Sequence, residues 1–211
     1  MNNVLLDDLP TEWHRYKLNT GFEIGIQLMQ VQYDNSINEY DKADIFLWLL
    51  FGDGESLRDH PDGEEFVECF QWFLNGWFHD NPDPESQSSR ERVVDYDVDQ
   101  WRIYADFRQI YGIDLAKAEY MHWWVFSGLL WNMPYRQSSF LQVVQTRQER
   151  PRNGASAEER RNINKMKKIY AIEQLDEKKE YTEEEKNSID EFDRMMEARR
   201  GRKLVTGYAA V

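Results

Sequence analysis

The sequence has few of the features that mark secreted and membrane proteins. Its 211 residues include one cysteine, Cys69, which excludes an internal disulfide, and residues 1–4 show neither the basic nor the apolar region of a signal peptide. The longest uninterrupted apolar run, residues 45–51, is far shorter than the roughly 20 residues that cross a bilayer. We therefore expect a protein of the reducing cytoplasm that has no membrane partner.

Positive charge is also scarce, since 26 Lys and Arg face 39 Asp and Glu, for a net charge of -13. Nucleic-acid affinity comes largely from cations against phosphate, so we expect no nucleic-acid partner. The charge is uneven: residues 1–150 hold 12 cations and 26 anions, whereas residues 151–211 hold 14 and 13, and all eight Trp lie at or before Trp131. This division predicts an acidic aromatic body over residues 1–150 and a charged arm with a frayed C-terminus over residues 151–211.

Sequence motifs of catalysis are missing as well. The chain has no phosphate-binding glycine loop, no serine-hydrolase elbow and no H-E-x-x-H pair, and its four histidines fall on different predicted elements. Asp95, Asp97 and Asp99 match the start of a calcium loop, but Gln100 stands where that loop requires glycine. We predict no catalytic residue, metal or cofactor, and we interpret Cys69 and His122 as buried structural residues.

Apolar residues at helical spacing predict an all-α fold, an irregular bundle of about six helices with a two-helix arm. Thr20 and Glu23 match a capping box for the first helix, which should end near residue 33. The second helix should begin near Asp41 and be buried on every face over residues 45–51. The other four are expected after Pro61, from about residue 95 to a left-handed Gly112, over about 117–132, and from near Ser138, with a polar loop over 80–92. The residues expected to support the core are Trp101, Tyr104, Phe107, Tyr111, Trp123, Trp124 and Trp131.

The arm carries two further capping boxes, Ser156 with Glu159 and Thr182 with Glu185, each at the start of a charged helix. Its apolar stripes are too thin for an independent domain and suit an arm that packs on the body, on a second copy or on a partner. Self-association and a folded-back hairpin both remain open. The expected partner-binding residues are Ile163, Met166, Tyr170, Phe192, Met195 and Met196.

Several strings between residues 95 and 130 carry a family resemblance. They are Asp95-Tyr96-Asp97, the run from Trp101 to Phe107, the run from Tyr111 to Leu115, and Met121-His122-Trp123-Trp124. This order resembles the tailed-bacteriophage family known as gene product fifteen, over roughly residues 5–175. The family's genes typically lie just upstream of the tape-measure gene. The resemblance implies a non-enzymatic tail assembly chaperone that binds and solubilises the tape-measure protein, or another phage tail protein, in the host bacterial cytoplasm.

Two alternatives remain beside the chaperone. The chain could be a permanent structural component of the phage tail or tail junction, which sequence does not separate from a transient chaperone. It could also be an acidic inhibitor that imitates DNA and blocks a host nucleic-acid enzyme, an idea that rests on the net charge of residues 1–150.

Overall fold

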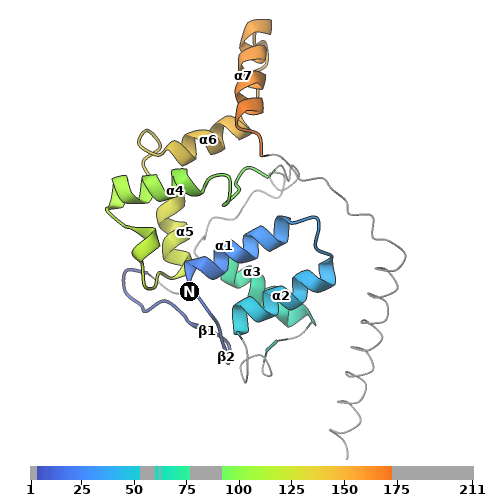
Figure 1. Ribbon diagram of the computed structural model, residues 1–211, viewed down its shortest axis with the longest axis vertical. Helices are drawn as coiled ribbons and strands as arrows, with labels where there is room; N and C mark the ends of the chain where they lie inside the picture. Colours follow the sequence, from blue (N-terminus) through green and yellow to red (C-terminus); the bar gives the residue numbers. More distant parts are fainter. Residues whose placement is uncertain (1–3, 53–59, 62, 77–91, 173–211) are drawn as a thin grey trace, which may run out of the picture. The chain divides into compact units, whose positions relative to one another are not determined.

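The computed structural model describes residues 4–52, 60–61, 63–76 and 92–172, and these residues are mostly helical (Figure 1). The chain divides into two compact units, residues 1–175 and 176–211, and all described residues belong to the first. The predicted all-α class is confirmed for this part of the chain. The predicted second arm helix, with its Thr182 and Glu185 capping box, falls outside the described residues, and the predicted boundary at residue 150 stays a prediction.

The α-helices of the described residues come in the following order along the chain. They are α1 (Phe22–Tyr33), α2 (Glu39–Phe51), α3 (Gly63–Asn75), α4 (Gln100–Asp106), α5 (Trp123–Trp131), α6 (Ser139–Gln148) and α7 (Ala157–Ile169). A π-helical turn, η3 (Phe107–Tyr111), continues α4, and a 3-10 turn, η4 (Leu115–Lys117), follows it. Before α1, the two-residue strands β1 (Glu12–Trp13) and β2 (Tyr16–Lys17) form an antiparallel hairpin in which Trp13 is opposite Tyr16.

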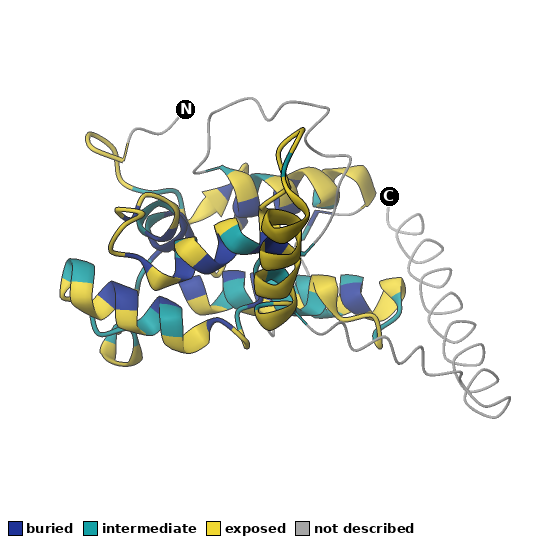
Figure 2. Ribbon diagram, turned by 90° about the horizontal axis from the view of Figure 1, so that it is seen from above, coloured by how far each residue is buried: buried dark blue, intermediate teal, exposed yellow. Residues whose placement is uncertain are grey.

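The core is built around the fully buried ring of Phe126 on α5. Its centroid lies 5.1 Å from Phe22 of α1, 5.1 Å from Phe107 of η3 and 5.7 Å from Trp123. Buried residues line the inward faces of the helices, with exposed residues on the outside (Figure 2). Offset aromatic contacts of this kind add to the burial of apolar area, so α5 is the central element of the described unit.

Two tryptophans attach α5 to its neighbours. The indole N–H of Trp123 donates to the carbonyl of Leu74 at 3.2 Å, and that of Trp124 donates to the carbonyl of Phe73 at 2.8 Å, both near the C-terminal end of α3. On the α1 side, a Cβ at Gly25 would lie 2.1 Å from a Trp123 ring carbon. Glycine is therefore what allows α1 to approach α5 so closely.

Asp106, at the end of α4, holds the start of α6. Its buried carboxylate accepts hydrogen bonds from the Ser138 hydroxyl at 2.8 Å, the Ser139 N–H at 3.2 Å and the Phe140 N–H at 2.9 Å. The Ser138 hydroxyl oxygen in turn accepts the Leu141 N–H at 3.0 Å. The predicted start of this helix near Ser138 is confirmed, and the carboxylate satisfies N–H groups that a helix N-terminus leaves unpaired.

The capping box predicted at Thr20 is wrong. The N-cap of α1 is Gly21, and the Thr20 hydroxyl lies 2.7 Å from the hydroxyl of Tyr120 instead. The cause is a long-range pairing of the backbone, in which Trp123 N–H donates to the Thr20 carbonyl and Phe22 N–H donates to the Met121 carbonyl, both at 2.8 Å. Because of the same pairing, α5 begins at residue 123 rather than near the predicted residue 117.

Other predicted boundaries have mixed outcomes. Gly112 has φ 71° and caps η3 in the left-handed region, and the Ser156 hydroxyl accepts the Glu159 N–H at 3.1 Å, as predicted. The second helix begins at residue 39, near the predicted Asp41, but it is not buried on every face, because Trp48 is 57% exposed. Most of the predicted loop, residues 80–91, lies outside the described residues.

The close approach of α1 to α5 gives a matched pair of glycine substitutions. Gly25→Ala places a methyl group against the Trp123 ring and should lower the free energy of unfolding by about 1–3 kcal/mol. Gly128→Ala, on α5, meets open space and should raise it by about 0.5–1 kcal/mol, because alanine favours the helix. Urea denaturation measures both. Two shifts of the same sign would contradict this packing.

His122 is the N-cap of α5, and its surroundings predict that the free energy of unfolding depends on pH. Its Nδ1 accepts the Trp124 N–H at 3.0 Å, its Nε2 lies 2.9 Å from the Pro10 carbonyl oxygen, and burial lowers its pKa below the ordinary 6.5. The folded state thus favours neutral imidazole. The contribution of neutral His122 to the free energy of unfolding is complete above pH 6.5 and is lost as the pH falls through the folded-state pKa.

The control is His122→Asn, which retains a capping oxygen but does not titrate. Between pH 7 and 5, the wild-type free energy of unfolding should fall more steeply than that of the variant, by up to about 1.4 kcal/mol per pH unit. Parallel profiles from denaturation at each pH would show that His122 is not neutral in the fold.

Candidate functional site

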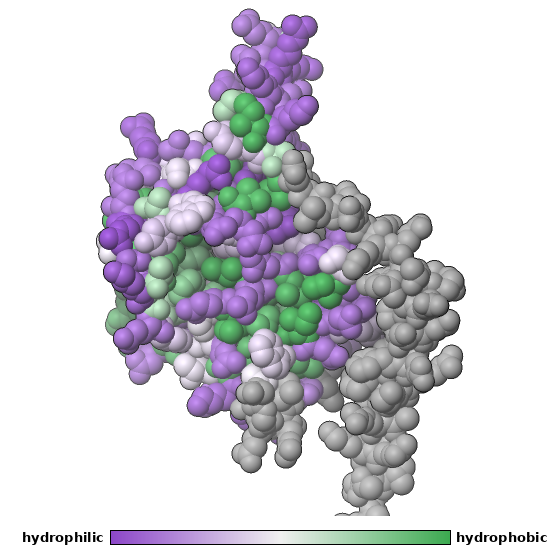
Figure 3. Space-filling view, viewed as in Figure 1, coloured by the Kyte–Doolittle hydropathy of each residue, from purple (hydrophilic) through white to green (hydrophobic). Residues whose placement is uncertain are grey.

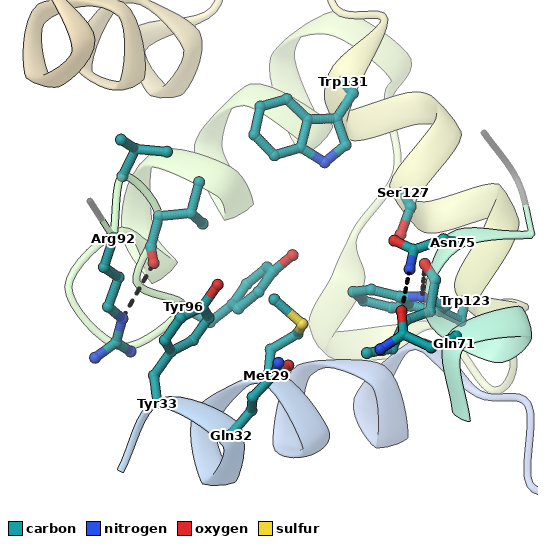
Figure 4. Close-up of a pocket in the computed structure, with 13 residues that line it drawn as sticks. Met29, Gln32, Tyr33, Gln71, Asn75, Arg92, Tyr96, Trp123, Ser127 and Trp131 are labelled. Carbon is teal, nitrogen blue, oxygen red and sulfur yellow. Dashed lines mark hydrogen bonds between the residues drawn. The ribbon is translucent and has the colours of Figure 1, made fainter. Parts of the chain in front are cut away.

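An open cleft of about 1020 Å³ lies between α1, α3, α5 and the segment that precedes α4 (Figure 4). We call it the aromatic cleft. Figure 4 shows α1 along its floor, residues 92–96 on one side, and α3 and α5 on the other. The described residues that line it are Met29, Gln32, Tyr33, Gln71, Leu74, Asn75, Arg92, Val93, Val94, Tyr96, Trp123, Ser127 and Trp131.

Helical spacing brings the apolar lining of the aromatic cleft together. Met29 and Tyr33 are one turn apart on α1, and Trp123, Ser127 and Trp131 follow one face of α5 at successive turns. Trp131 is 38% exposed and Tyr33 is exposed, so both present aromatic surface to solvent. Trp131, expected to support the core, packs on the buried Phe140 with ring centroids 5.8 Å apart and otherwise faces the cleft.

Arg92 is the only charged residue among the described residues that line the aromatic cleft. Its Nη2 lies 2.9 Å from a carboxylate oxygen of Asp95, its Nε donates to the Val94 carbonyl at 3.3 Å, and its guanidinium lies 5.0 Å from the ring centroid of Tyr33. The adjacent carboxylate offsets this charge. The cleft is thus suited to apolar and aromatic groups more than to an anion.

Ser127 adds one polar atom to the cleft. The side-chain oxygen is buried, the residue is 1% exposed, and this oxygen has no hydrogen-bond partner among the described residues. An unpaired buried hydroxyl is unfavourable, so Ser127 is a local cost of this packing. On the opposite wall, burial raises the pKa of Tyr96, which keeps its phenol neutral.

A second, smaller cavity of about 430 Å³ lies between α1, α4, η4 and α5. Tyr96 lines both this cavity and the aromatic cleft. Trp101 and Tyr104 lie on its α4 side with ring centroids 6.0 Å apart, and no charged residue is among the described residues that line it. Trp101 is 75% exposed, so the expectation that it supports the core is wrong.

The other expected core residues divide by depth. Phe107, Trp123 and Trp124 are buried, whereas Tyr104 and Tyr111 are partly buried and donate their hydroxyls to the Asp114 carboxylate at 3.1 Å and the Leu129 carbonyl at 2.9 Å. Apolar and aromatic side chains also reach the surface in groups among hydrophilic ones (Figure 3).

A buried ion pair joins the wall of the aromatic cleft to α6. Both terminal nitrogens of Arg147 donate to the carboxylate of Asp99, at 2.6 and 2.9 Å, and both residues are buried. Nη1 also donates to the Val93 carbonyl at 2.8 Å, and Nε donates to the Tyr170 carbonyl at 2.7 Å. One guanidinium therefore holds the cleft wall, the start of α4 and the end of α7.

The expected partner-binding residues of α7 occupy different surroundings. Ile163 is buried, Met166 is 40% exposed, and the Tyr170 ring is partly buried, with the Arg102 guanidinium 5.8 Å from its centroid. Tyr170 thus makes contacts within the chain. Phe192, Met195 and Met196 lie outside the described residues.

Neither a metal-ligand cluster nor a membrane-spanning helix is found among the described residues. They contain no group of three or more His, Cys, Asp or Glu that could hold a metal ion, and no described helix is long and apolar enough to cross a membrane. Cys69 is buried as expected, and burial raises its pKa to about 12, which keeps it protonated. The features that remain are the aromatic cleft and the smaller cavity, and both are suited to binding.

The residues that line the cleft are far apart in the sequence. The α1 residues Met29 and Tyr33 continue a readable stripe, but Arg92 and Ser127 have no local signal, because only the packing of α1, α3 and α5 brings them together. The sequence showed Asp95, Asp97 and Asp99 only as the start of an incomplete calcium loop. Asp99 instead pairs with Arg147, 48 residues away.

A family model described as Bacteriophage Gp15 protein matches residues 3–172, which is most of the chain and includes the aromatic cleft, the smaller cavity and α7. No curated protein and no solved structure matches the chain.

The Arg147 contacts predict that even lysine is a poor replacement. Arg147→Lys keeps the charge but cannot serve Asp99 with two nitrogens and also reach two carbonyls, so the free energy of unfolding should fall by about 2–3 kcal/mol. Arg136→Lys, at an exposed position, should change it by less than about 0.5 kcal/mol. Chemical denaturation compares the two, and equal midpoints would contradict the role of Arg147.

Proposed function

Because the chain belongs to the bacteriophage Gp15 protein family, we propose that it is a non-enzymatic chaperone of phage tail assembly that binds the tape-measure protein and keeps it soluble. The tape measure is suggested by the usual place of the family's genes, just upstream of the tape-measure gene. The tape measure is a long helical protein whose apolar stripes are exposed before tail-tube subunits surround it. A chaperone must cover such stripes without chemistry.

The observation that carries the proposal is the aromatic cleft. An amphipathic helix docks by placing its apolar face in a hydrophobic groove, and the cleft offers Met29, Tyr33 and Trp131 at such a surface. Methionine adapts to different side chains, and exposed aromatic rings provide large contact areas at low entropic cost. These properties suit a client with many similar apolar stripes.

The charge of the chain supports the same role. A net charge of -13 makes copies of the chain repel one another, so a client covered by several copies would stay dispersed. The described cleft lining itself is nearly uncharged, because Arg92 is paired with Asp95. The apolar contact and the solubilising charge are thus provided by different parts of the surface.

Co-expression with the tape-measure protein of the same phage genome tests the proposal. Met29→Glu puts a charge in the aromatic cleft and should reduce soluble co-purified tape measure by about tenfold, because truncating or charging a central contact removes most of a binding hot spot. Val67→Glu makes the same kind of change on the outer side of α3, where Val67 is 57% exposed, and should leave co-purification unchanged.

Thermal unfolding of both variants checks that each is folded. Failure of the folded wild-type chain to co-purify any tape measure would remove it as client. The presence of the chain in purified virions at a fixed copy number would instead favour a structural component of the tail.

A further inference from the structure

One face of α1 runs beneath both the aromatic cleft and the smaller cavity. Phe22, Ile26, Met29 and Tyr33 are spaced as i, i+4, i+7 and i+11, and we call them the α1 stripe. The first two line the smaller cavity, and the last two line the aromatic cleft. The midpoints of these pairs are seven residues apart, which corresponds to about 10.5 Å along the helix.

Tyr96 separates the two cavities, since its side chain lines both. Its ring lies 6.3 Å from Trp123 and 6.4 Å from Phe126, centroid to centroid, so α5 supports it from behind. A hydrogen bond of 2.6 Å from the Gln30 side-chain amide to the Asp97 carboxylate ties this segment to α1. The two cavities therefore follow one another along α1, with an aromatic partition between them.

We propose that the two cavities bind two large apolar side chains of one partner helix, seven residues apart, with that helix lying along α1. Residues i and i+7 of a helix lie on nearly the same face and are separated by about 10.5 Å, the spacing of the two cavities along α1. The inference rests on the proposed function, because it describes the client segment that this chaperone would hold.

The charged residues beside the two cavities indicate which polar residues the partner helix should carry. A second row on α1, Glu23, Gln27, Gln30 and Asp34, flanks the α1 stripe and has a carboxylate at each end. Asp97 adds an exposed carboxylate at the partition. Arg92, the one cation in the part of the cleft lining that the structure describes, is paired with Asp95. The complementary partner is a helix with large apolar residues at i and i+7 and with Lys or Arg beside them.

Peptides of about 20 residues that tile the tape-measure protein of the same phage test this geometry against the full-length chain. Peptides that bind should share an i, i+7 apolar pair flanked by cations. In fluorescence anisotropy, alanine at either anchor should weaken binding by about tenfold. Moving one anchor two residues along the peptide, at unchanged composition, should weaken it equally, and exchanging the flanking cations for glutamate should weaken it as well.

A protein variant assigns the anchors to the cavities. Ile26→Trp fills the smaller cavity and should weaken binding of the parent peptide by about tenfold. One of the two peptides with a single anchor replaced by alanine already lacks the side chain for this cavity, so the variant should not weaken the binding of that peptide further. Val67→Trp, on the outer side of α3, should have no effect on either peptide. Circular dichroism verifies that both variants keep the wild-type fold.

The outcomes separate the two proposals. Three outcomes would overturn the two-anchor geometry but leave the chaperone role standing. In the first, the peptides that bind share no preferred spacing; in the second, Ile26→Trp does not change binding. In the third, no peptide binds although the full tape measure co-purifies. Failure of the full tape measure to co-purify with the wild-type chain would contradict the proposed function itself.

Discussion

The buried ion pair between Asp99 and Arg147 is the interaction on which the described unit depends most. It joins the start of α4 to the end of α6, and the same guanidinium holds the carbonyls of Val93 and Tyr170. Asp106 secures the other end of the α4 and α6 pair by capping the first turn of α6. A buried pair contributes little net stability compared with apolar packing, but loss of one partner is costly, so its main effect is to fix one arrangement.

This arrangement determines the shape of the candidate site. Val93 and its neighbours form one wall of the aromatic cleft, so the hydrogen bond from Arg147 holds that wall in place. Trp123 forms part of the opposite side, held by the Leu74 carbonyl and by its contact with Gly25. Because both sides are fixed by buried contacts, the cleft is present before any partner binds, which lowers the entropic cost of binding.

The ends of helices could be predicted from the sequence where the capping residue bonds to a near neighbour in the chain. The residues of the candidate site could not be predicted in this way. Ser138, Gly112 and Ser156 mark helix ends through bonds to residues a few positions away, and these predictions are confirmed. The Thr20 cap failed because the hydroxyl pairs with Tyr120, 100 residues away. Trp101 illustrates the limit of periodicity: its α4 position is compatible with burial, yet no described element covers it, and it borders the smaller cavity.

Site-specific photo-crosslinking tests most directly the central claim, that the cleft over α1 is where a client binds. A photoreactive phenylalanine would replace Tyr33 at the rim of the aromatic cleft or, as the matched control, the exposed Tyr40 of α2. In cells that produce the tape-measure protein, the account predicts a crosslink to it from position 33 and none from position 40. A crosslink from position 40 alone would contradict the account and place the client on α2.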